Sequence, residues 1–113
     1  MPHAVISGAP PLDQFWHGFE PYQQVNGSEV RNLLAAYLRS DTTQLLVLAL
    51  AIELGVTQRF LIVVEQKKTN TVVRCQQHHP VEKTAGVKAL VAQVAIRLIE
   101  GGGTLEKTNL PEL

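Results

Sequence analysis

The sequence contains a single cysteine, Cys75, so the chain cannot form an internal disulfide bond. Small secreted domains usually depend on several disulfides, and a reducing compartment therefore fits this composition better. The first residues also lack the basic start and the long apolar stretch of a signal peptide. These absences together predict a cytoplasmic protein.

Net charge and long apolar runs are missing as well. Ten Lys and Arg balance ten Asp and Glu, which gives a formal net charge of +0 at pH 7. This balance disfavours a protein that mainly binds nucleic acid non-specifically, and it removes the charge repulsion that would oppose self-association. The longest apolar run, Leu45 to Ile52, is far shorter than the ~20 residues of a membrane-spanning helix. We therefore expect no membrane insertion.

Signatures of catalysis and of phosphate binding are absent from the sequence. It has no Gly-x-Ser-x-Gly, no His-Glu-x-x-His and no Gly-Lys-Ser/Thr segment. The three glycines at 101–103 follow a predicted helix, whereas phosphate-binding loops precede one. The sequence thus favours a protein without a cofactor and gives no support for an enzyme.

Apolar residues make up 45% of the chain, enough for a packed core in one domain. Residues 1–11 hold three prolines and a glycine without periodicity, which predicts a flexible N-terminal arm. We expect a single domain over 12–103, and residues 104–113, beyond the glycines, as a loosely held C-terminal tail.

Residues 28–40 show the spacing of an amphipathic helix. Ser28 is a favourable N-cap after the Asn26-Gly27 turn. Apolar side chains then recur at the i, i+3, i+4, i+7 and i+8 positions of one helical face: Val30, Leu33, Leu34, Tyr37 and Leu38. The pattern predicts a helix that ends near Ser40.

Residues 44–54 fit either a helix or a strand, because an apolar run has no periodicity to decide between them. As a strand, the segment would place large side chains on one face and small ones, Ala49 and Ala51, on the other. The abundance of Leu and Ala favours a helix. Asp41 with Gln44 resembles a capping box, and Gly55 fits a C-cap. We therefore predict a helix.

Two strands and a final helix complete the expected fold. Residues 59–66 and 71–77 are rich in β-branched side chains, and the polar turn between them predicts a hairpin. Residues 81–100 carry an apolar helical stripe: Val87, Leu90, Val91, Val94, Ala95 and Leu98. The predicted class is α+β, with a short N-terminal turn, two helices, a β-hairpin and a long C-terminal helix.

Two groups of residues resemble parts of metal sites. Cys75 and His78 have a chelating spacing beside His79, but no second pair of ligands accompanies them. The segment Glu65-Gln66-Lys67 resembles part of a nuclease motif, which also needs an upstream Asp, and Asp41 is the available residue. We expect no bound metal, with Cys75 in the core and Glu65 at a solvated strand end.

The remaining candidates for binding are an aromatic cluster and a basic patch. Phe15, Trp16, Phe19 and Tyr22 supply four of the six aromatic residues, either as a lid on the core or as a docking surface. Lys67, Lys68 and Arg74 form the patch on the predicted hairpin. The aromatics favour a non-catalytic interaction, assembly or regulatory subunit that binds another protein. The alternative is a nucleic-acid-binding or nuclease-like domain that uses the basic patch.

A two-stranded hairpin would leave one strand edge unpaired, and an unpaired edge can bind a strand of another molecule. Together with the absence of net charge, this predicts a homodimer.

Overall fold

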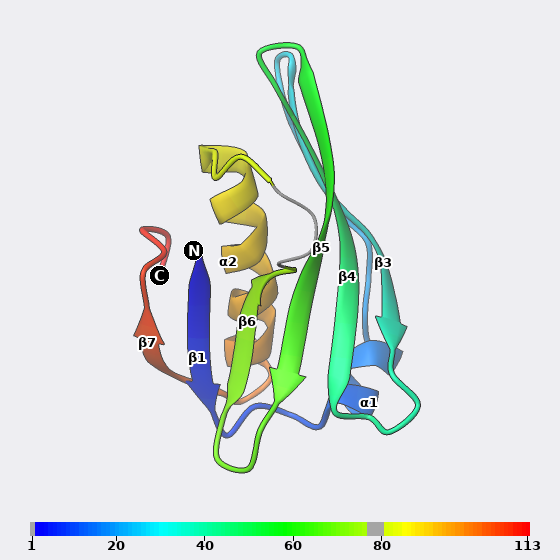
Figure 1. Cartoon of the computed structure of the whole chain (residues 1–113), viewed down its shortest axis with the longest axis vertical. Coiled ribbons are helices and arrows are strands. Elements are labelled where there is room, and N and C mark those ends of the chain that lie inside the picture. Colours follow the sequence, from blue (N-terminus) through cyan, green and yellow to red (C-terminus); the bar gives the residue numbers. More distant parts are fainter. Residues whose placement is uncertain (1, 77–80) are drawn as a thin grey trace.

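The computed structural model describes residues 2–76 and 81–113. These residues form one antiparallel sheet of seven strands in the order β2-β3-β4-β5-β6-β1-β7, with helix α2 against one of its faces (Figure 1). The elements are β1 (His3–Ser7), α1 (Leu12–His17), β2 (Tyr22–Asn26), β3 (Glu29–Leu38), β4 (Gln44–Glu53), β5 (Val56–Gln66), β6 (Thr71–Cys75), α2 (Ala85–Glu100) and β7 (Thr104–Thr108).

The sheet curls around α2, which contacts β3 and β4 on one side and β6 and β1 on the other. The core lies between the helix and the concave face of this half-barrel. Every residue of the stripe predicted for the last helix is buried, so that prediction is confirmed. The helix begins at Ala85, after the N-cap Thr84, whose hydroxyl accepts a hydrogen bond from the N–H of Val87.

The predicted α+β class is wrong, because the two helices expected over 28–40 and 44–54 are the long strands β3 and β4. Only α1, with 6 residues, and α2, with 16, are helical among the described residues. The protein is therefore mostly β, a curled seven-stranded antiparallel sheet around one long helix.

Strand β3 imitates a helical pattern because it has a bulge and is apolar on both faces. Its register against β4 shifts between Leu33 and Ala35, which reverses the alternation of side chains from that point. Leu33 and Leu38 face the core. Val30 and Tyr37 pair with residues of β4 that point away from the core, so they lie on the opposite face of the sheet. Apolar residues from two faces therefore fall at helical spacing in the sequence.

Residues 44–54 form mainly a strand, β4, which was the alternative that their composition disfavoured. It lies between β3 and β5, where pairing on both sides overrides the helical preference of Leu and Ala. Its presumed helix end is a two-residue hairpin turn, in which both Leu54 (φ 50) and Gly55 (φ 77) have positive φ. This combination is that of a type I′ turn, which matches the twist of the flanking strands.

The structure places both ends of the chain in the sheet. Residues 3–7, expected within a flexible arm, form β1 between β6 and β7, and the side chains of Ala4 and Ile6 are fully buried. Residues 104–108 of the expected loose tail form β7, and Leu110 beyond it is also buried.

The predicted hairpin of 59–66 and 71–77 is present as β5 and β6. Both of its strands lie inside the sheet, so the hairpin has no free edge. The open edges belong to β2 and β7. Among the described residues, neither helix has the length and hydropathy needed to cross a membrane.

Candidate protein-interaction face

The convex face of the sheet carries a row of large apolar side chains. Strand β4 directs its small Ala49 and Ala51 toward the core, so the residues between them point to the opposite face. We call this surface the uncovered face and define it by Tyr37 of β3, Leu46, Leu48, Leu50 and Ile52 of β4, and Leu61 of β5. Val63 of β5 points the same way but is only 2% exposed.

The register brings these side chains together across three strands. Leu46 lies between Tyr37 and Val63, and Leu48 lies beside Leu61. Such cross-strand neighbours are in side-chain contact distance, and they shield one another from water. This explains why the four large side chains of β4 are half-buried, whereas Tyr37 at the margin is 55% exposed.

Both helices lie on the other side of the sheet in the part of the chain that the structure describes. Helix α2 packs into the concave face (Figure 1), and the buried Leu12 of α1 belongs to the same core. An apolar face of this extent on a three-strand surface is typical of a protein–protein contact.

The aromatic cluster is divided between the core and the surface. Phe15, Phe19 and Tyr22 are partly buried and pack against the core, as a lid would. Trp16 is 39% exposed, and its indole N–H donates a hydrogen bond of 3.0 Å to the backbone carbonyl of Ala36 in β3. Trp16 therefore lies at the margin of the sheet, next to the residue that precedes Tyr37.

Arg97 of α2 holds the lid against the helix. Its guanidinium donates a 2.6 Å hydrogen bond to the carbonyl of Glu20 and lies 5.6 Å from the ring centre of Phe19 and 5.8 Å from that of Tyr22. A shallow pocket of about 340 Å³ opens beside these residues, with Phe15 and Glu100 in its wall. The guanidinium of Arg97 in its wall is engaged in these contacts. Its described lining contains no serine, threonine, cysteine, lysine or histidine that could act as a nucleophile.

The basic residues do not form a uniform patch. Lys67 and Lys68 lie in the turn between β5 and β6. Arg74 lies farther along β6, and its guanidinium is 3.7 Å from the carboxylate of Glu65. This ion pair offsets the charge of Arg74, so the local excess of positive charge rests on the two lysines.

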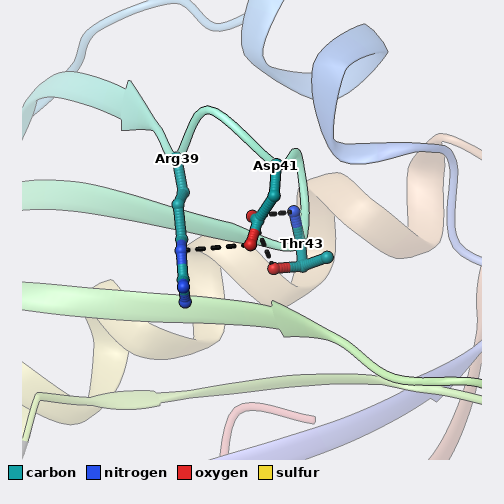
Figure 2. A network of polar contacts seen from close by, with 3 residues as sticks. All are labelled: Arg39, Asp41 and Thr43. Atoms are coloured by element: carbon teal, nitrogen blue, oxygen red, sulfur yellow. Dashed lines mark hydrogen bonds and ion pairs between the residues drawn. The ribbon is translucent and has the colours of Figure 1, made fainter.

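Asp41, the Asp considered for the nuclease motif, is held in the turn between β3 and β4 (Figure 2). Its carboxylate accepts hydrogen bonds from the hydroxyl and the N–H of Thr43, at 2.7 and 3.1 Å, and lies 3.2 Å from the Nε of Arg39. The bonds from Thr43, followed by the charge of Arg39, lower the pKa of Asp41. Asp41 therefore shapes a turn instead of capping the predicted helix.

Cys75 is fully buried in the core opposite Ile62, as the sequence predicted for a small core residue. Burial raises the pKa of its thiol. A protonated, inaccessible thiol is a poor nucleophile and a poor metal ligand. His78 and His79, the other members of the possible metal group, lie outside the described residues. Among the residues that are described, no three His, Cys, Asp or Glu side chains gather as metal ligands would.

Sequence reasoning missed the uncovered face because it assigned 44–54 to a helix. The signal was present in the alternation of large and small residues, which only a strand separates onto two faces. Comparison of the chain with protein-family models, with curated proteins and with solved structures gives no match.

Proposed function

We propose that this protein is a non-catalytic interaction or assembly subunit that binds another protein through the uncovered face of its sheet. The observation that carries the proposal is the row of large apolar side chains on β4, opposite the face that α2 covers. The proposal includes a cytoplasmic location, which the single buried cysteine supports.

The choice of residues supports binding over mere stability. Strand β4 uses alanine at two of its core-facing positions and leucine or isoleucine at the positions between them. A sheet face that is meant to remain in water usually carries polar side chains. Burying a fully exposed leucine contributes roughly 1.5–3 kcal/mol. These side chains are already partly buried, and a partner would bury the part that is still exposed.

Tyr37 and Trp16 add aromatic contacts at one margin of the face. Both side chains are exposed, and both belong to residue types that are enriched among the strongly contributing residues of interfaces. Nucleic-acid binding receives less support, because Glu65 offsets the charge of Arg74.

The test replaces Leu46 and Leu50 together with threonine, which keeps the β propensity of the strand and removes apolar surface. We expect the double variant to fold and to lose the partner proteins that the wild type retains in cross-linked extracts of the native host. Thermal melting checks the fold, and quantitative mass spectrometry compares the retained proteins.

Val56→Thr is the matched control, since Val56 is 61% exposed at a hairpin end away from the centre of the face. It should retain the wild-type partners. An unchanged set of partners in the Leu46→Thr/Leu50→Thr variant, despite a native melting curve, would contradict the proposed function.

A further inference from the structure

The two open edges of the sheet are protected very differently. At one edge, β7 carries the charged residues Glu106 and Lys107, and its pairing with β1 is broken by a register shift. Charges and bulges are the features by which natural sheets prevent a further strand from adding. At this edge, addition of another strand is therefore disfavoured.

The other edge is formed by β3 and, over part of its length, by β2. Where β3 continues past the N-terminal end of β2, helix α1 contacts it instead. There the indole N–H of Trp16 donates a hydrogen bond to the carbonyl of Ala36. A covering helix is a further means of protecting an edge. Only the β2 part of this edge is left open among the described residues.

Strand β2 lacks such protection. Its five residues, Tyr22–Asn26, include no charged side chain, and the last four are exposed to solvent. With β3 it forms a hairpin that extends beyond the N-terminal end of α2, next to the β4–β5 hairpin (Figure 1). In the part of the chain that the structure describes, its short length and Pro21 before it are the features that restrain added pairing.

We propose that the free edge of β2 pairs with the β2 edge of a second copy, in antiparallel orientation around a two-fold axis. In a two-fold interface each side chain near the axis meets its own counterpart, so a charged residue there would be repelled. A strand without charge, in a chain without net charge, avoids that repulsion. A second copy is therefore the occupant that fits this edge.

The register of the β2–β3 hairpin sets the register of the dimer. Hydrogen-bonding groups alternate in direction along a strand, and Asn26 flanks the two-residue turn opposite Glu29. The backbone groups of Gln23 and Val25 then point to the open edge. In an antiparallel pair, the backbone groups of Gln23 bond to those of Val25 in the second copy, and those of Val25 bond to Gln23 there. This pairing places Gln24 on the two-fold axis. The two Gln24 residues become a close cross-strand pair, with their Cα atoms ~4.5 Å apart.

This edge differs from the uncovered face, so the inference goes beyond the proposed function, and each can fail without the other. The experiment uses Gln24→Lys and Gln24→Glu in sedimentation velocity runs of the full chain over a range of micromolar concentrations. The wild type should approach twice the 12.4 kDa mass of one chain. Each variant alone should dimerise about fivefold more weakly or worse, because like charges meet at the axis.

An equal mixture of the two variants should recover the dimer, since Lys then faces Glu. A variant that dimerised weakly only because its fold was destabilised would not regain the dimer on mixing. Gln24→Glu also has Arg31 opposite it across the hairpin, which is a favourable neighbour for its charge. Thr57→Lys, on an exposed position of β5, is the matched control and should dimerise like the wild type.

A wild type that stays at 12.4 kDa at all concentrations would overturn the proposal. So would a mixture that dimerises no better than its components, or a dimer that Leu46→Thr/Leu50→Thr abolishes while the Gln24 variants leave it intact. The last outcome would assign self-association to the uncovered face.

Discussion

The carboxylate of Glu53, at the end of β4, accepts a hydrogen bond of 2.8 Å from the backbone N–H of Gly86 in the first turn of α2. The same carboxylate accepts a hydrogen bond from the hydroxyl of Thr84, the N-cap of that helix. Helix N-termini have unpaired N–H groups and a partial positive charge, which a carboxylate satisfies. One strand end therefore fixes the start of the helix over the sheet.

This contact predicts an unusual response of Gly86 to substitution. Replacing a helical glycine with alanine ordinarily stabilises a protein by about 1 kcal/mol. Here a Cβ on Gly86 would lie 2.8 Å from the carboxyl carbon of Glu53. The carboxylate is the end of a flexible side chain, so it would move aside and lose its bonds to the helix start. Gly86→Ala should therefore lower the free energy of unfolding by up to about 1 kcal/mol instead of raising it. Urea denaturation measures the change.

The control for this prediction is the double variant. Glu53→Ala alone should lose about 1 kcal/mol with the capping bonds, and it removes the atoms that meet the added Cβ. In the Glu53→Ala background, Gly86→Ala should then be neutral or stabilising. An equal loss in both backgrounds would show that the clash is not the cause.

The turn between β4 and β5 offers a stabilising substitution. Leu54 is 94% exposed and has a φ of 50, which costs a residue with a Cβ roughly 1–2 kcal/mol. Asparagine tolerates this conformation, and Asn-Gly is the preferred pair for type I′ turns. Leu54→Asn should raise the free energy of unfolding by about 1 kcal/mol, measured by urea denaturation. Val56→Asn, exposed but with ordinary φ, should give no gain.

Cys75 should be inert in the folded protein and should make stability fall at alkaline pH. Its pKa is raised above the ordinary value of 9.0 by burial, so the unfolded chain releases the thiol proton first. The resulting contribution to stability is complete below pH 9.0 and is lost as the pH rises from there toward the raised pKa of the folded state.

Two measurements test this behaviour of the thiol. Iodoacetamide should alkylate Cys75 only after denaturant is added. Thermal melts of the wild type and of Cys75→Val should diverge above pH 9, because only the wild type has this titrating group. Rapid alkylation under native conditions would show that Cys75 is accessible, contrary to its burial.

The sequence predicted the elements that have only one apolar face or a clear turn. The stripe of α2 and the β5–β6 hairpin are present in the structure, and the turn expected at Asn26-Gly27 lies one residue later, at 27–28. Each of them is specified by local spacing or by turn residues, which act over a few positions. These elements therefore required no knowledge of the rest of the fold.

Strands β3 and β4 could not be predicted in the same way. Local propensity favoured helices for both, whereas their state is set by pairing with strands distant in the sequence. The bulge at Leu34 can be recognised only once the pairing register of β3 with β4 is known, and that register depends on the bulge. The uncovered face, which depends on both strands, was lost with them.

The ends of the chain were misread for a related reason. Prolines and glycines around β1 and before β7 mark turns, and the strands between them have only five residues each. Two segments of that length are recognised as strands only when the partner strand is known. Their pairing, His3–Ser7 with Thr104–Thr108, joins the two ends of the sequence.

Trp16 provides the test that separates the lid from the exposed part of the aromatic cluster. A fully buried tryptophan truncated to alanine would cost about 3–5 kcal/mol. Trp16 is 39% exposed and makes one hydrogen bond, to Ala36. We therefore expect Trp16→Ala to lower the free energy of unfolding by only about 1–2 kcal/mol, the sum of one hydrogen bond and partial apolar burial.

Leu33→Ala, at a fully buried position of β3, should cost about 2–5 kcal/mol in the same urea titration. As Trp16 is the sole tryptophan, iodide should quench the wild-type fluorescence in the native state. Fluorescence that resists iodide, together with a loss as large as that of Leu33→Ala, would place Trp16 in the core and remove it from the margin of the proposed interface.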